Sequence, residues 1–207
     1  MPEMTVEQQK ELQDKLSKMS PEELREFQKS QCIFCQIIGG AIPSRIVYKD
    51  SKVTALMDIN PASDGHLLIL PNEHYAVMPQ MPEDELTHLY TVVKQLSQSL
   101  IKTLGVEGTT IFAANGAAAG QRANHFMVHI IPRESNDGLP LNIELKQIGG
   151  GQYEQMRKQL APIVAKMLGG TKEKSREEPK DTPEEETKQI KTQNGGSDLD
   201  KISELLK

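Results

Sequence analysis

The sequence has few cysteines, few aromatic residues and no long apolar run. Its 207 residues include two cysteines, no tryptophan, four tyrosines and four phenylalanines. Two cysteines are too few for the disulfide framework of a small secreted domain, and no apolar run approaches the roughly 20 residues that span a membrane. Because no signal-peptide pattern opens the chain either, we expect a soluble, cytoplasmic protein with no membrane partner.

Positive charge forms no block anywhere in the chain. The net charge is −5, which argues against nucleic acid as a partner. Charge of both signs concentrates in residues 171–207, where 8 Lys or Arg and 10 Asp or Glu occupy 37 positions. This composition predicts a largely disordered tail. The apolar residues near its end, from Leu199 to Leu206, have the spacing of a short helix and leave open a docking segment for a protein partner.

The two cysteines, Cys32 and Cys35, are separated by two residues. In a chain without an export signal, this spacing indicates half of a metal site or a redox pair. A third interpretation also stays open, in which two small apolar residues lie buried on one short segment.

The pattern of apolar and turn residues predicts an α+β domain with helical additions. Two short helices are expected in residues 1–31, the second beginning at the capping box of Ser20 and Glu23. Strands are expected at 46–48, 53–57, 66–70, 109–114 and 125–131, and a long helix at 82–104. A last helix at 153–168 should be kinked or split by Pro162.

These elements predict four regions in the chain. They are an N-terminal helical extension at 1–31, a main domain at 32–135, a C-terminal helical part of that domain at 136–170, and the charged tail at 171–207. We find no internal repeat.

The strand predicted at 125–131 carries two histidines. Side chains alternate across a strand, so His125, Met127 and His129 share one face while Phe126 and Val128 share the other. Imidazoles on an apolar strand are costly unless they bind something. They indicate either a functional site or two hydrogen-bonded structural histidines.

Five sequence blocks occur in an order and spacing that resemble the histidine-triad (HIT) family of nucleotide-binding hydrolases and transferases. They are Cys-Ile-Phe-Cys-Gln-Ile-Ile, Leu-Met-Asp-Ile-Asn-Pro, Gly-His-Leu-Leu-Ile-Leu-Pro-Asn-Glu-His, Asn-Gly followed by Ala-Gly-Gln, and the segment 125–133. The resemblance implies a five-stranded antiparallel sheet with a long helix. It also implies a homodimer in which two sheets join.

The sequence departs from the family pattern at the position of its nucleophile. The family carries three histidines at alternate strand positions, and the middle one attacks phosphorus. Here His125 and His129 match the outer two, but Met127 occupies the middle position. A thioether forms no phosphoryl intermediate of this kind. In addition, Arg122 follows Gln121 where family members usually place Ser or Thr, and a guanidinium favours anion binding.

The resemblance also implies two sets of site residues. A structural Zn²⁺ would be held by Cys32, Cys35, His74 and His125. For a nucleotide, Asp58 would accept the ribose hydroxyls and Ile59 would lie against the base. The phosphate would be contacted by Asn115, Gly120, Gln121, Arg122 and His129. We expect His66 to be structural.

Three functions remain open at this point. The first is binding of a purine mononucleotide or nucleoside phosphate with weak or absent hydrolysis. The second is a working hydrolase or transferase of altered mechanism, for example water attack assisted by His129. The third is an interaction adaptor that acts through the helical N-terminus and the charged tail.

Overall fold

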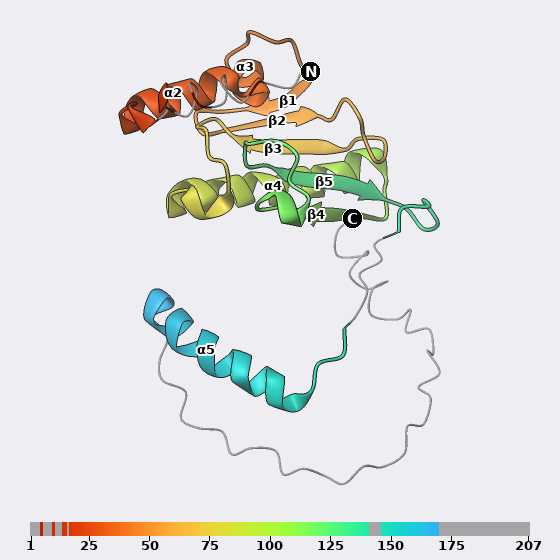
Figure 1. The fold of residues 1–207 in the computed structure, drawn as a ribbon. Coiled ribbons are helices and arrows are strands. Elements are labelled where there is room, and N and C mark those ends of the chain that lie inside the picture. The colour runs from red at the N-terminus through yellow and green to blue at the C-terminus, as the bar shows by residue number, and fades with distance from the viewer. Residues whose placement is uncertain (1–4, 6–9, 11–13, 16, 141–145, 170–207) are drawn as a thin grey trace. The chain divides into compact units, whose positions relative to one another are not determined.

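The computed structural model describes residues 5, 10, 14–15, 17–140 and 146–169 (Figure 1). Most of the first predicted helix, and the whole predicted tail with its terminal helix, lie outside the described residues. The chain divides into two compact units, of which the first extends to Leu139 and the second begins at Pro140. Each unit is described by itself, and the predicted region boundaries stay predictions.

The described part of the first unit contains one five-stranded antiparallel sheet in the order β1-β2-β3-β5-β4. The α+β fold expected from the sequence is therefore confirmed. Figure 1 shows the strands side by side with β1 and β4 at the two edges. The strands are β1 (Ile46–Lys49), β2 (Val53–Met57), β3 (Leu67–Pro71), β4 (Gly108–Phe112) and β5 (Val128–Arg133).

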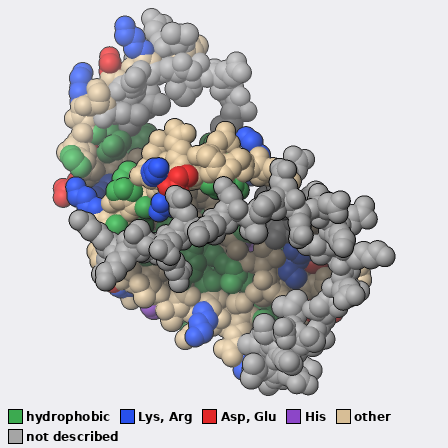
Figure 2. Space-filling model, turned by 90° about the horizontal axis from the view of Figure 1, so that it is seen from below, with side chains coloured by type: hydrophobic (Ala, Val, Ile, Leu, Met, Phe, Trp, Pro, Cys, Tyr) green, Lys and Arg blue, Asp and Glu red, His purple; other side chains and the backbone are tan. Residues whose placement is uncertain are grey.

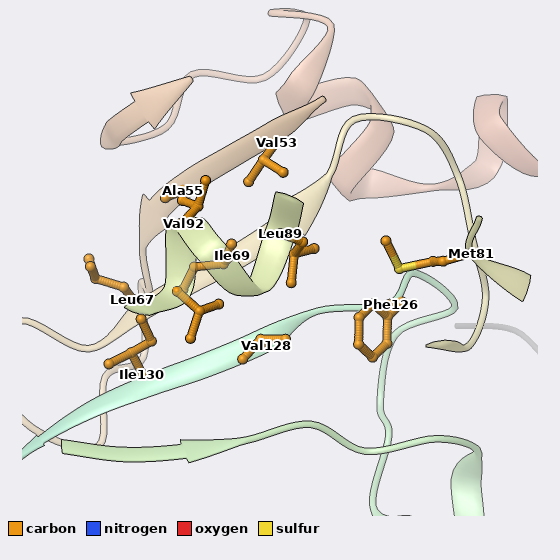
Figure 3. Close-up of a cluster of buried hydrophobic side chains, with 11 residues drawn as sticks. Val53, Ala55, Leu67, Ile69, Met81, Leu89, Val92, Phe126, Val128 and Ile130 are labelled. Carbon is orange, nitrogen blue, oxygen red and sulfur yellow. The ribbon is translucent and has the colours of Figure 1, made fainter. Parts of the chain in front are cut away.

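The long helix α4 (Glu83–Leu104) covers one face of the sheet. Acidic side chains in its first turn stabilise the N-terminal end of the helix. Gly105, in the left-handed conformation, ends the helix. Figure 3 shows the buried side chains between α4 and the strands. This core cluster consists of Val53, Ala55, Leu67, Ile69, Met81, Leu89, Val92, Val93, Phe126, Val128 and Ile130.

The opposite face of the sheet is covered by a short helix, α3 (Ile33–Ile38), which the sequence analysis did not predict. Alternation along β3 divides its side chains between the two faces, because Ile69 packs toward α4 while Leu68 packs toward α3. We call the second cluster the α3 cluster. It consists of Leu56, Leu68 and Leu70, against which Phe34, Ile37, Ile38 and Met127 pack.

Helix α2 (Pro21–Gln31) precedes α3 and begins as the sequence predicts. The Ser20 hydroxyl accepts a hydrogen bond from the Glu23 N–H at 3.2 Å, and the Glu23 carboxylate accepts one from the Ser20 N–H at 2.8 Å. This reciprocal capping box confirms the predicted start of the second helix.

The predicted start of the last strand was wrong by three residues, since β5 begins at Val128 and not at His125. The reason is that the preceding segment pairs with a loop instead of a strand. The Phe126 N–H donates to the Tyr75 carbonyl at 2.6 Å, beyond the end of β3. Smaller differences are that β3 ends at Pro71 and that β4 spans Gly108–Phe112.

In the second unit, α5 (Gly150–Leu168) continues through Pro162 as one helix. The predicted split is therefore wrong, and the predicted kink stays a prediction. Several apolar side chains of α5 are exposed. Figure 2 shows one face of the molecule, on which apolar side chains reach the surface beside Lys and Arg. None of the helices in the described ranges has the length and apolar content needed to cross a membrane.

Asp50 ties the hairpin of β1 and β2 to α4. Its carboxylate accepts hydrogen bonds from the backbone N–H groups of Lys52 and Val53, at 2.8 and 2.7 Å. The Tyr48 hydroxyl and the His88 ring also donate to it, each at 2.7 Å. Burial alone would raise the pKa of Asp50, but these four hydrogen bonds outweigh burial and hold its pKa well below the ordinary value.

We therefore expect Asp50→Asn to lower the free energy of unfolding at pH 7 by about 2 kcal/mol. Because the pKa of Asp50 is lower in the folded state, its contribution is present above the unfolded pKa of about 3.9 and is lost as the pH falls below it. Urea unfolding between pH 3 and 7 measures both effects. Asp84→Asn is the matched control, since the Asp84 carboxylate is exposed beside Lys52, and this variant should lose less than about 1 kcal/mol.

Candidate functional site

Four side chains from distant parts of the sequence meet at the N-terminus of α3. The Cys32 Sγ lies 3.4 Å from the His125 Nδ1. The Cys35 Sγ lies 3.3 Å from the His74 Nδ1 and 3.6 Å from the His125 Nδ1. These are the four residues that the resemblance assigned to a metal, and their ligand atoms all lie within 4.8 Å of one another.

The spacing of these atoms fits a tetrahedral ion. Zn–S bonds of about 2.3 Å and Zn–N bonds of about 2.0–2.1 Å place sulfur and nitrogen ligands about 3.5 Å apart. The observed distances of 3.3 to 3.6 Å lie around this value. The Nε2 of His125 lies 3.0 Å from the Pro71 carbonyl, so it carries the proton and leaves Nδ1 free to bind a metal.

Burial disfavours charge on Cys35 and on His125 in the absence of an ion. Burial is the largest cause that raises the pKa of the Cys35 thiol to about 12. A hydrogen bond and an electrostatic interaction with Cys32 raise it further. Burial likewise lowers the pKa of His125 to about 4. A bound cation would stabilise thiolates at the same positions, because metal ligation and deprotonation are coupled. The residues present thus form a Cys₂His₂ set that can hold a structural metal.

A second group of polar side chains lies on the same face of the sheet, beside the α3 cluster. It consists of Asp58 at the end of β2, His66 before β3 and His129 in β5, and their ligand atoms also lie within 4.8 Å of one another. The His66 Nε2 is 3.1 Å from the His129 Nδ1. The sequence analysis did not predict this contact, which depends on the pairing of Leu68 with His129 between β3 and β5.

The hydrogen bonds of this group determine which ring nitrogens carry protons. A backbone amide can only donate, and the Ala62 N–H donates to the His66 Nδ1 at 3.1 Å. The His66 Nε2 therefore carries the proton and donates to the His129 Nδ1. This leaves the N–H of His129 on Nε2. Burial lowers the pKa of both histidines, so both rings are neutral near pH 7.

One face of the His129 ring is covered by Phe112 of β4. The two rings stack with their centroids 4.4 Å apart and their planes 4° from parallel. Phe112 itself is partly exposed. The His129 ring is therefore held from two sides, by His66 and by Phe112, which fixes the direction of its remaining N–H group.

Met127 lies between the two sites and packs into the α3 cluster. Although the residues before Val128 are not part of β5, the predicted alternation of faces still holds for them. Phe126 is buried in the core under α4, whereas Met127 and the metal-set residue His125 lie on the α3 side. The side chain at the position of the family's nucleophile therefore belongs to an apolar cluster.

The small-residue loop after β4 uses much of its hydrogen-bonding capacity within the protein. The amide group of Gln121 donates to the carbonyls of Ala76 and Ala123, at 2.6 and 2.8 Å, and accepts from the Gly116 N–H at 2.7 Å. The Asn115 side-chain oxygen accepts from the Met78 N–H at 2.8 Å. The predicted phosphate contact of Gln121 stays a prediction, and it would break one of these bonds.

The other predicted contact residues lie at the surface. Gly120 ends the 3₁₀ turn η2 (Ala117–Ala119) with a φ of 88°, a conformation that favours glycine. Arg122 is exposed on the same loop. Ile59, the predicted base contact next to Asp58, is 80% exposed, so its side chain is available to a ligand.

A five-stranded antiparallel sheet with a metal-type set and a histidine pair on one face defines a HIT-like protein. The sequence profile of the HIT domain matches residues 39–136. An uncharacterized HIT-like protein of Methanocaldococcus jannaschii is 47% identical over 107 residues, covering 52% of this chain and 82% of that protein. The chain therefore belongs to the HIT family.

A sequence and a solved structure from Candida albicans are also similar. One, named adenosine 5'-monophosphoramidase, is 32% identical over 143 residues, covering 65% of this chain and 94% of that protein. The other is a crystal structure titled histidine triad nucleotide-binding protein, which is 30% identical with a TM-score of 0.59, covering 66% of this chain and 99% of that one. The likeness thus extends to proteins named for nucleotide binding and hydrolysis.

Proposed function

We propose that this protein binds a purine nucleoside phosphate at the site of Asp58 and His129, with weak or absent hydrolysis. The observation that carries the proposal is the place of Met127, which packs into the α3 cluster where a nucleophile would be needed. The names of the similar sequence and structure from Candida albicans support the ligand class.

The roles of the residues follow from their chemistry. The Asp58 carboxylate accepts the ribose hydroxyl protons, and the exposed Ile59 side chain packs against the base. The His129 Nε2–H donates to a phosphate oxygen, with Asn115 and Arg122 at the loop beside it. A thioether has no proton to exchange and forms no stable bond to phosphorus, so Met127 supports no covalent intermediate.

Replacing the thioether tests this proposal. We expect Met127→His to raise the turnover of an adenosine phosphoramidate, measured by release of AMP, by at least about tenfold over a very low starting rate. Thermal stability should fall somewhat, because an imidazole would replace an apolar side chain in the α3 cluster. Met57→His, a methionine replaced at the exposed end of β2, is the control and should give no gain.

Two further variants separate the sites. His129→Ala should leave the metal content unchanged, and His125→Ala should lower the metal content without weakening AMP binding. Turnover of the unmodified protein at an ordinary enzymatic rate would contradict weak hydrolysis.

One observation favours the alternative of an active hydrolase. The hydrogen bond between His66 and His129 gives His129 a defined donor nitrogen, which can stabilise the charge that develops on a phosphoryl oxygen as water attacks. If this alternative holds, the unmodified protein turns over phosphoramidates and His66→Ala abolishes that activity.

We further infer that the metal held by Cys32, Cys35, His74 and His125 is Zn²⁺ in a structural role. Two thiolates and two imidazoles with tetrahedral spacing are ligands that zinc prefers in closed sites. All four protein ligands are supplied by the chain, which leaves no open position for a substrate. The ion would hold the start of α3 against the segment between β3 and α4.

We expect about one zinc per chain in protein purified without chelator, measured by elemental analysis. Cys35→Ser should remove most of the zinc and lower the melting temperature, because a hydroxyl is a poor zinc ligand. His88→Ala serves as the control, since His88 lies outside the metal set, and it should keep its zinc. A zinc-free unmodified protein would refute the assignment.

We infer a homodimer that joins the sheets of two chains at β4. This strand lies at an edge of the sheet and has exposed apolar side chains, including Ile111 at 44% exposure. Exposed edge strands with apolar side chains favour pairing with another strand. The opposite edge, β1, offers a comparison, because Val47 there is 52% exposed.

Light scattering at micromolar concentration should give about twice the 23.0 kDa chain mass. Ile111→Lys should shift the protein toward the monomer, because burying a charged side chain where two β4 strands pair costs free energy. Val47→Lys, the matched change at the other edge, should leave the mass unchanged. A monomeric unmodified protein, or equal effects of the two variants, would contradict the β4 interface.

The adaptor function and the cytoplasmic location both stay predictions. The adaptor depends chiefly on the charged tail at 171–207, which lies outside the described residues. Deleting that segment and testing for loss of a bound partner addresses it directly.

A further inference from the structure

Hydrogen-bond donors are scarce on the side of the site where a phosphate would lie. Of the predicted phosphate contacts, Gln121 has both amide hydrogens engaged with carbonyl groups. Met127 has no donor at all. His129 keeps one neutral N–H, since its other ring nitrogen accepts from His66. The side-chain donors that remain among these predicted contacts are this single N–H, the amide group of the exposed Asn115 and the guanidinium of Arg122.

Part of the loop backbone is also engaged within the protein. Phosphates are often held by runs of backbone N–H groups that point outward from a glycine-rich loop. In this loop, four of those groups bond within the loop itself, with distances of 2.7 to 3.3 Å. They are the N–H groups of Gly116, Ala119, Gly120 and Gln121.

The charge around the site also disfavours a phosphate dianion. Asp58 accepts from the Asn60 N–H at 2.9 Å and brings a carboxylate into the same group of side chains as His129. Both histidines of that group are neutral near pH 7, for the reasons of burial given above. Arg122 is the cation on the neighbouring loop, and it is exposed to solvent, where its interactions are screened.

The apolar part of the site is better developed than its anionic part. Ile59 and Phe112 both expose apolar surface, at 80% and 44%. They come from the end of β2 and from β4, next to Asp58 and His129 respectively. A base and a ribose can use these apolar surfaces and the Asp58 carboxylate without any contact to phosphate.

We propose that this site recognises its ligand through the nucleoside and gains little or nothing from the phosphate. A free purine nucleoside then binds about as tightly as its 5'-monophosphate, or more tightly. This inference rests on the proposed function, because it concerns the same pocket. It differs in assigning the binding energy to Asp58 and the apolar side chains instead of to the phosphate loop.

Calorimetric titration of the full chain at pH 7.5 tests the inference. The ligands are adenosine, guanosine, their 5'-monophosphates and inorganic phosphate. For the purine that binds, we expect the dissociation constants of nucleoside and monophosphate to agree within about threefold, or to favour the nucleoside, with no detectable binding of phosphate. A monophosphate bound about tenfold tighter, equal to about 1.4 kcal/mol, would overturn the inference and leave the proposed function standing.

Three variants make the titration specific. Asp58→Asn should weaken nucleoside and monophosphate equally, since both contain the ribose. Arg122→Gln should leave the ratio of the dissociation constants of nucleoside and monophosphate unchanged. A selective loss of monophosphate binding would contradict the inference. Met127→His adds a donor near His129 and should shift the preference toward the monophosphate.

Failure of the proposed function gives a different result. If neither purine binds in either form at millimolar concentration, or if Asp58→Asn leaves the affinity unchanged, the pocket itself is wrongly assigned. The ratio of the dissociation constants of nucleoside and monophosphate then has no meaning, and both the inference and the proposed function are wrong.

Discussion

The packing of α3 against the sheet is the contact on which both candidate sites depend. A helix of six residues does not form alone in water, and its N-cap, Cys32, makes no capping hydrogen bond through its side chain. Its stability must come from the α3 cluster and from the metal-type set at its start. Phe34 belongs to both, because it packs on the cluster and its ring centroid lies 6.1 Å from that of His125. The α3 cluster therefore lies beside both the metal set and the group of Asp58, His66 and His129.

The α3 cluster also determines the surroundings of Met127. On the same sheet face, Leu68 pairs with His129 and belongs to the apolar cluster against which the partly buried Met127 packs. A histidine there would place a polar ring in that cluster, at a free-energy cost that a catalytic function would have to justify. With methionine, the position adds to the core that supports α3. Under the proposed function, Met127 supplies packing and no nucleophile.

The sequence predicted the parts of the structure that depend on local pattern and motif. β2 was predicted at its observed bounds because turn residues flank a short run of strand-favouring residues. The four metal-type residues meet as the resemblance implied. The start of β5 was wrong because the Phe126 N–H bonds to the Tyr75 carbonyl, which no local pattern reveals. α3 was missed because so short a helix is stabilised by tertiary packing. The pairing of His66 with His129 and the internal bonds of Gln121 arise only once the strands are in register.

The central claim is that the site of Asp58 and His129 holds a nucleoside ligand without covalent chemistry at position 127. A crystal structure of the protein soaked with an adenosine phosphoramidate tests it most directly. The account predicts an intact ligand whose ribose hydroxyls lie within hydrogen-bonding distance of the Asp58 carboxylate, with Met127 still packed on the α3 cluster. Density for a nucleotidyl group bonded to His129, or a ligand bound away from Asp58, would contradict it.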